Sequence, residues 1–306
     1  MKSTLISWVL LFSCNLMWSL QFTCIKLTQD QIGPFFTVWA PMVLSTILLY
    51  PFAKKDFSKS EKSWKDIRIF IILVLLGSFP AQILITKGTQ LSLASNAAIL
   101  TLSLPVITAL FAFLLLNEKM NRIRWISFGI AMLGVVLVSI NDIENLNLGS
   151  KYMLGNIIVV LAIIGNAFYN SGSKKIIDRF TSVEMVFFTY LFMVIFLTPL
   201  VIYFEPDIFS TIPSFTKQTW IGILLLTIFH NFLSMILFFK ALKKLEAMQV
   251  ALSNYLIPFF GIPIAAIWLK EKVGIITIIG GVLIFVSTLM VTMIDYKMRD
   301  KAIVHG

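Results

Sequence analysis

The sequence contains one long apolar stretch twice, 153 residues apart. Residues 94–119 align without a gap on residues 247–272, and the same offset extends backwards to residues 84 and 87. The alignment pairs Pro105 with Pro258 and the dipeptide Glu118-Lys119 with Glu271-Lys272. Self-similarity of this kind in a very apolar chain is typical of membrane transporters that are built from two related halves.

The composition places the chain in a lipid bilayer. Hydrophobic residues make up 58% and charged residues 13% of the 306 residues, which leaves a soluble domain too little polar surface to cover its core. Crossing about 30 Å of hydrocarbon takes about 20 apolar residues in a helix. Ten such stretches are expected, at residues 4–26, 33–53, 67–87, 94–116, 122–140, 153–173, 182–203, 218–240, 247–269 and 273–294.

Five of these spans precede an acidic, Asn-rich break at residues 141–151, and five follow it. An odd number of spans per half forces the two halves into opposite orientations across the membrane, related by a pseudo-two-fold axis in the membrane plane. We therefore predict an all-α integral membrane protein with ten transmembrane helices in a 5+5 inverted repeat. The expected parts are a first repeat (1–141), a linker (142–152), a second repeat (153–296) and a tail (297–306).

The distribution of charge predicts the orientation. With a cytoplasmic N-terminus, 18 of the 25 Lys and Arg residues fall in inside segments and 6 in outside segments, and Lys240 remains within a helix. This bias satisfies the positive-inside rule and predicts that both termini are cytoplasmic. The net charge of +10 is thus attributed to the membrane rather than to nucleic acid. Short tails and no visible targeting motif favour a bacterial inner membrane.

Several motifs resemble those of the EamA family of the drug/metabolite transporter superfamily. Each repeated helix ends in a Leu-x-Glu-Lys turn and has a proline near its middle, and Trp18, Phe22 and Lys26 follow one another at four-residue spacing. Gly-rich closing helices fit as well, with Gly129 and Gly134 in one and Gly280 and Gly281 in the other. The resemblance implies this family's fold and the export of amino acids or related metabolites. Relatives often carry an Arg near the start of the second helix, where this chain has Val38-Trp39-Ala40-Pro41, so no role of that Arg is transferred.

Polar and amphipathic residues cluster near the middle of several predicted spans. Unsatisfied amides are costly in hydrocarbon, so these groups should face one another or a wet cavity where the two halves meet. Bridging between helices is the alternative role for each of them. The candidate substrate-binding residues are Asn15, Trp18, Gln21, Phe22, Thr101, Asn166, Tyr169, Asn170, His230, Asn231, Asn254 and Tyr255.

Prolines and ionisable residues within the spans have two interpretations each. Pro105, Pro258 and Pro263 are candidate hinges or static kinks. Lys87 and Lys240 either extend to opposite interfaces or bind an anion. His230 is a core residue, a substrate contact or a protonation site.

The two repeated glutamates also have more than one interpretation. Glu118 and Glu271 stand at helix C-termini, where the helix dipole disfavours a carboxylate and a partner is needed. They are expected to act as structural caps or gate salt bridges, and proton transfer is the alternative.

Enzymatic function is not indicated. The chain shows no carboxylate pair, His-rich cluster or nucleophile-base arrangement at membrane depth and no phosphate-binding GxxxxGK[ST] motif. We therefore expect no catalytic residue, metal or cofactor, and a small-molecule substrate and the bilayer as partners. The oligomeric state is left open, a homodimer included. The predicted function is secondary transport, with export of small metabolites such as amino acids. The alternative is exchange of an organic anion or a nucleotide-sugar-type substrate that is recognised by the membrane lysines.

Overall fold

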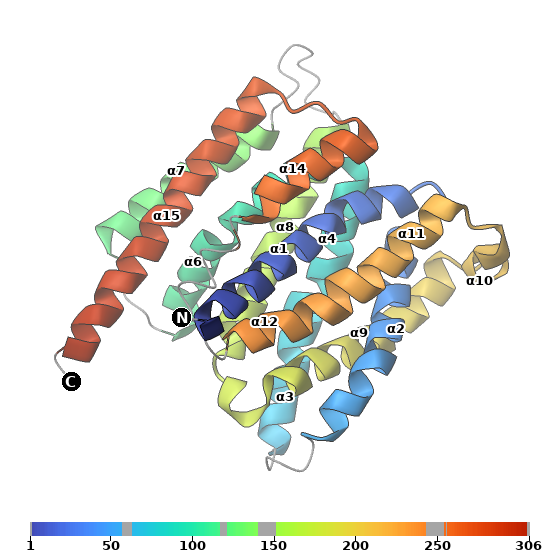
Figure 1. Ribbon diagram of the computed structural model, residues 1–306, viewed down its shortest axis with the longest axis horizontal. Helices are drawn as coiled ribbons and strands as arrows, with labels where there is room; N and C mark the ends of the chain where they lie inside the picture. Colours follow the sequence, from blue (N-terminus) through green and yellow to red (C-terminus); the bar gives the residue numbers. More distant parts are fainter. Residues whose placement is uncertain are drawn as a thin grey trace.

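The computed structural model describes residues 2–56, 63–116, 121–139, 151–242, 254 and 256–304 (Figure 1). Every regular element within these ranges is helical, and no strand occurs there. The elements of the first repeat are α1 (Lys2–Thr28), α2 (Pro34–Lys54), α3 (Trp64–Leu73), η1 (Val74–Ser78), α4 (Phe79–Leu91), α5 (Ala94–Leu100), η2 (Thr101–Ser103), α6 (Leu104–Leu116) and α7 (Arg122–Ser139). Those of the second are α8 (Lys151–Ser173), η4 (Ile177–Arg179), α9 (Ser182–Phe204), α10 (Ile208–Thr211), η5 (Ile212–Ser214), α11 (Lys217–Leu225), η6 (Leu226–Leu233), α12 (Ser234–Leu242), α14 (Leu256–Leu269) and α15 (Ile275–Val304).

The length and hydropathy of these helices fit a membrane protein. Seven continuous helical stretches in the described part of the chain are long and apolar enough to cross a bilayer, and shorter apolar helices occupy Leu256–Leu269 and Ile275–Met290. Residues 243–253, which hold most of the first half of the span expected at 247–269, lie outside the described residues. The chain is thus an all-helical, multi-pass membrane protein.

The helices of the two repeats pack against each other reciprocally. The first helix of each repeat contacts the third and fourth helical stretches of the other: α1 packs on α11, η6, α12 and α14, and α8 packs on η1, α4, α5 and α6. Helix α2 packs on α9, and α7 on α15, which run side by side at one edge of the molecule (Figure 1). The centre of the molecule is therefore built from both halves of the chain.

Two of these contacts depend on glycine. A Cβ atom on Gly88 would lie 2.8 Å from the carbonyl oxygen of Gly155, and one on Gly134 would lie 2.6 Å from that of Gly280. Backbone atoms cannot yield to such an overlap. The two glycine pairs let α4 approach α8, and α7 approach α15, at backbone contact.

Three expected helices change their geometry along their length. The stretch 64–91 contains the π-helical turn η1, and the stretch 217–242 contains the π-helical turn η6. The helix that begins at Ala94 passes through the 3₁₀ turn η2 just before Pro105. Pro258 is buried in α14 and Pro263 is exposed in it, so the hinge role of the three prolines stays a prediction.

Carboxylates of the second repeat cap helices of the first. Glu271 accepts hydrogen bonds from the backbone N–H of Ala94 (2.8 Å) and of Ser95 (3.0 Å) and from the Ser95 hydroxyl (2.8 Å). The positive end of the α5 dipole favours the carboxylate there. Of the alternatives for the repeated glutamates, Glu271 is therefore a structural cap, and Glu118 lies outside the described residues.

A second carboxylate has the same role at α2. Glu205 accepts from the backbone N–H of Phe35 and of Phe36, both at 3.0 Å. In the opposite direction, Asp56, just after α2, accepts at 3.0 Å from the hydroxyl of Thr181, the N-cap residue of α9. Helices α2 and α9 are thus joined at both ends.

Candidate functional site

A cavity of about 470 Å³ lies where the two repeats meet. Helices α1, α2, α4, α8, α9 and α12 and the turns η1 and η6 all contribute to its wall. The lining residues are Trp18, Met42, Ser78, Gln82, Asn166, Tyr169, Asn170, Ser173, Met185, Val186, Thr189, Tyr190, His230, Asn231, Met235 and Phe238. A volume of this size holds a small metabolite.

Hydrogen bonds hold the polar part of this wall in place. The Tyr169 hydroxyl lies 2.8 Å from the Thr189 hydroxyl, which itself donates to the carbonyl oxygen of Met185 at 2.6 Å. Because a hydroxyl has one proton, Tyr169 is the donor to Thr189. The Tyr190 hydroxyl donates to the side-chain oxygen of Asn231 at 3.3 Å. Each tyrosine therefore has a fixed orientation toward the cavity.

Aromatic and sulfur-containing side chains form the apolar part of the wall. The rings of Trp18 and Phe238 are 5.2 Å apart and tilted by 45°, which joins α1 to α12 across the repeat interface. The side chains of Met42, Met185 and Met235 line the same space. Unbranched methionine side chains adapt to ligands of different shape, so this part of the cavity suits an apolar group.

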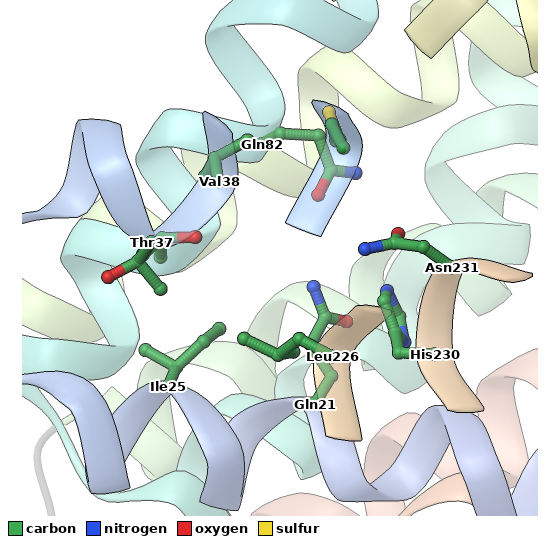
Figure 2. A pocket seen from close by; sticks show the side chains of 10 residues that line it. Gln21, Ile25, Thr37, Val38, Gln82, Leu226, His230 and Asn231 are labelled. Carbon is green, nitrogen blue, oxygen red and sulfur yellow. The ribbon is translucent and has the colours of Figure 1, made fainter. Parts of the chain in front are cut away.

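A small polar chamber adjoins the main cavity and shares four of its residues, Met42, Gln82, His230 and Asn231. Its volume is about 20 Å³, enough for one or two small polar atoms. Figure 2 shows the side chains of Gln21, Gln82, His230 and Asn231 converging on it. Thr37, Thr86 and apolar residues complete the chamber.

Among the described residues that line the two spaces there is no Asp, Glu, Lys or Arg. Among the residues that the structure describes, no group of three or more His, Cys, Asp or Glu side chains could hold a metal ion. An uncharged wall of amides, hydroxyls and one imidazole binds by hydrogen bonds rather than by ion pairs.

Seven of the predicted site residues lie in these two spaces. Trp18, Asn166, Tyr169, Asn170, His230 and Asn231 line the main cavity, and Gln21 lines the chamber. They come from α1, α8 and η6, so the structure brings together residues that are more than 200 positions apart in the sequence.

The other predicted residues lie elsewhere. Asn15 is fully buried and donates to the carbonyl oxygen of Leu11, Phe22 belongs to a hydrophobic core, and Thr101 bonds the carbonyl oxygen of Ala98. The side-chain oxygen of Asn254 is buried with no hydrogen-bond partner in the described structure. None of these four lines either space, and Tyr255 lies outside the described residues.

Of the two candidate anion-binding lysines, the structure describes the side chain of Lys87 alone, and it lines neither space. Lys87 is exposed near the end of α4, where its charge acts on Glu205. Nothing is described for the side chain of Lys240. Exposure of Lys87 favours the interface role that the sequence left open.

Sequence reasoning missed the contributions of the third and seventh spans. Ser78, Gln82 and Thr86 follow one another at four-residue spacing, which places them on one helix face, and all three line one or both spaces. That pattern was visible in the sequence. Thr189 and Tyr190, in contrast, sit among phenylalanine, methionine and leucine neighbours in α9, where no periodic polar face marks them.

The profile of a known family matches almost the whole chain in two copies. The model of the EamA-like transporter family matches residues 5–140 and again residues 153–293. The chain belongs to the EamA-like transporter family. It is therefore a membrane transporter with a two-repeat architecture and not an enzyme.

Individual members of this family align along most of the chain. The uncharacterized transporter YetK of Bacillus subtilis is 22% identical over 270 residues, which cover 85% of this chain and 81% of YetK. A probable terminal-alkyne amino-acid exporter of Streptantibioticus cattleyicolor is 21% identical over 306 residues, with 100% and 99% coverage. A solved crystal structure covers 96% of both chains with a TM-score of 0.64 and 16% identity, which supports the fold alone.

Proposed function

We propose that this EamA-family protein is a secondary transporter that exports small metabolites, such as amino acids, across the cytoplasmic membrane by alternating access. The observation that carries the proposal is the cavity of about 470 Å³ between the repeats, with its uncharged polar wall and its apolar wall. Amides and hydroxyls suit the polar end of a zwitterion, while Trp18, Phe238 and the methionines suit an apolar side chain. Export as the direction is supported by the printed name of the Streptantibioticus relative.

The proposal includes the architecture predicted from the sequence. Ten transmembrane helices would form a 5+5 inverted repeat, with residues 1–141 and 153–296 as the two repeats, joined by residues 142–152 and followed by a tail (297–306). The reciprocal packing of α1 and α8 supports this arrangement, because each contacts the third and fourth helical stretches of the other repeat. Both termini would lie in the cytoplasm of a bacterium, in accordance with the positive-inside bias.

Alternating access fits the position of the cavity. Lining residues Ser173, Met185 and Phe238 lie near the end of α8, the start of α9 and the last turns of α12, all of which are at the same end of the bundle in the proposed topology. At the opposite end, Glu205 and Glu271 hold α2 and α5 to the second repeat. We therefore infer that the cavity faces the cytoplasm and that the outer end is closed.

Anion exchange is the alternative proposal. An anion needs a fixed positive partner in a low-dielectric site, and no Lys or Arg occurs among the described residues that line the two spaces. This lining favours a neutral or zwitterionic substrate.

The test is tracer counterflow in proteoliposomes that are loaded with amino acids or with phosphorylated and carboxylate anions, with and without a pH gradient. Amino-acid counterflow that falls about tenfold in Asn166→Ala, as expected for a lost polar contact, would support the proposal. The matched control is Gln218→Ala, an exposed amide at the start of α11, which should transport like the wild type. Strict anion-for-anion exchange that is lost in Lys87→Gln would replace the proposal by the alternative.

A further inference from the structure

The polar chamber beside the main cavity has the size and lining of a site for one small polar group. Its volume of about 20 Å³ exceeds the 10–15 Å³ that one water molecule needs, so a small polar group fits there. It opens on the main cavity through the side chains that the two spaces share, among them Gln82, His230 and Asn231. A ligand can therefore reach into the chamber while most of it stays in the main cavity.

Asn231 presents a hydrogen-bond donor to this chamber. Its side-chain oxygen accepts from the Tyr190 hydroxyl at 3.3 Å, so its NH₂ group is directed to the other side. In Figure 2 the nitrogen of Asn231 points into the space between Gln21 and Gln82. Tyr190 is buried, and its hydroxyl also lies 3.4 Å from the backbone carbonyl oxygen of Asn231. A residue of α9 thus contacts both the side chain and the backbone of Asn231.

Three further side chains can add donors. The Nδ1 atom of His230 is buried with no hydrogen-bond partner in the described structure, and it donates in one neutral tautomer. Gln21 and Gln82 approach from α1 and α4, and each has an NH₂ group that can turn toward a ligand. The NH₂ group of Asn231 would donate a hydrogen bond to an oxyanion or a carbonyl oxygen. It offers no acceptor to a cationic group.

The π-helical geometry of η6 makes this convergence possible. The backbone N–H of Ser234 bonds the carbonyl oxygen of Phe229, five residues earlier, as in a π-helix. Leu226, His230 and Asn231 then face one chamber although His230 and Asn231 are consecutive residues. π-helical turns occur often at functional sites.

We propose that this chamber is the subsite for the carboxylate of the transported substrate, with Asn231 as its fixed donor and Gln21, Gln82 and His230 as additional donors. The inference rests on the proposed function. It adds that the carboxylate end of the substrate enters the chamber while the rest stays in the main cavity. Bonds to a carboxylate from neutral donors are charge-assisted and therefore stronger than bonds between neutral groups. Tyr190 is a positioning residue, because it acts through Asn231.

The experiment is competition in the counterflow assay with four compounds. These are one transported amino acid, its methyl ester, the amine without the carboxylate and the acid without the amine. The amino acid and the deaminated acid should compete well, and the amine and the ester should be at least about tenfold weaker, because they lose charge-assisted bonds. An amine that competes as well as the amino acid would overturn the proposal and leave a chamber that holds water only.

Variants separate a carboxylate subsite from general damage. Asn231→Leu keeps the size of the side chain, removes the donor and should abolish the difference between acid and amine. Tyr190→Phe should reduce that difference without removing it, since Asn231 can then rotate. Asn166→Ala, in the main cavity only, should weaken all four analogues and keep their order. If Asn231→Leu and the wild type show the same difference between acid and amine, the carboxylate subsite is wrong.

The outcomes also separate this inference from the function on which it rests. If amino acids exchange and the analogues do not differ, only the subsite is wrong. If no amino acid exchanges, the proposed function fails and the subsite falls with it.

Discussion

The π-helical turns η1 and η6 occupy equivalent positions in the two repeats but differ in cause and content. The offset that aligns Pro105 with Pro258 places Val74–Ser78 on residues 227–231, inside η6. In η1 the cause is Pro80, which lacks an N–H group and whose ring displaces the carbonyl four residues earlier, so that the N–H of Phe79 bonds Val74 instead.

In η6 no proline is present, and serine hydroxyl groups donate hydrogen bonds to backbone carbonyl oxygens of the turn. Ser45 donates to the carbonyl oxygen of Thr227 at 3.2 Å, and Ser234 donates to that of His230. The same local geometry thus occurs both with and without a proline.

The two turns also carry different residues at equivalent positions. Gly77 of η1 corresponds to His230 of η6, and Ser78 to Asn231. Gly77 packs directly on α8, whereas its counterpart His230 lines the cavity and the chamber. Ser78 and its counterpart Asn231 both line the main cavity. The comparison teaches that equivalent positions of a repeated fold can serve packing in one copy and a polar lining in the other, because their side chains differ.

The largest effect is expected when the packing turn receives the residue of the binding turn. In Gly77→His the new Cβ would lie 2.9 Å from the Tyr169 Cβ and 3.1 Å from the carbonyl oxygen of Gly165, before the ring is accommodated. We expect a destabilisation at the upper end of about 1–3 kcal/mol and little monodisperse protein in size-exclusion chromatography of the detergent extract. The control is Gly129→Ala, since no atom lies within 4 Å of a Cβ there. A well-folded Gly77→His protein would show that the two turns are interchangeable.

Removal of the imidazole from the equivalent position of η6 should reduce transport and leave the fold intact. His230→Ala removes an imidazole that lines both spaces, and α-helical propensity does not oppose alanine. Counterflow of the preferred amino acid should fall about tenfold, the equivalent of roughly 1.4 kcal/mol, while the melting temperature stays within a few degrees. Unchanged transport would restrict the role of His230 to packing, as in the alternative that the sequence left open.

A moderate effect is expected at the cap of α5. Glu271→Ala leaves two backbone N–H groups and the Ser95 hydroxyl without their acceptor, at a cost of about 2 kcal/mol in stability. Glu271→Gln keeps one oxygen and should lose about half as much. Thermal unfolding followed by intrinsic fluorescence measures both. The same substitution at Glu118 tests whether the first repeat has an equivalent cap, and equal losses would extend the symmetry of the repeats.

The smallest effect concerns the pH dependence at the end of α9. Burial raises the pKa of Glu205 above its ordinary value of 4.5, although the N–H groups of Phe35 and Phe36 and the charge of Lys87 oppose the shift. The folded protein therefore holds this proton more tightly than the unfolded chain, and stability is lost as the pH rises from 4.5 through the raised pKa. Glu205→Gln cannot titrate, so its melting temperature relative to the wild type should increase over this range.

The control for this measurement is Asp207→Asn, an exposed residue two positions later, which should keep the wild-type profile. A wild-type profile in Glu205→Gln would mean that other groups dominate the pH dependence.

The sequence was sufficient for the membrane class, the repeat and part of the lining of the two polar spaces. Apolar length sets the number of residues that cross a bilayer, and the offset of 153 residues is visible without coordinates. Trp18, Gln21, Asn166, Tyr169, Asn170, His230 and Asn231 were predicted because polar groups in hydrocarbon need partners or water, and the two polar spaces contain all seven. Asn15 and Thr101 meet the same need with carbonyl groups of their own helices, a solution that the sequence pattern does not distinguish from a cavity.

Only the tertiary structure decided how these groups are arranged. Which face of α9 meets the cavity depends on the packing of α2, η1 and α12 against it, and so Thr189 and Tyr190 line the cavity without a signal in the sequence. Within the π-helical turn that brings His230 and Asn231 to one chamber, the carbonyl oxygen of Thr227 accepts a hydrogen bond from Ser45 of α2, 182 residues away. The sequence determines what must be buried and how long each span is, because these follow from solvation and helix rise. The tertiary structure determines which buried polar groups face one another, because that depends on contacts between helices from both repeats.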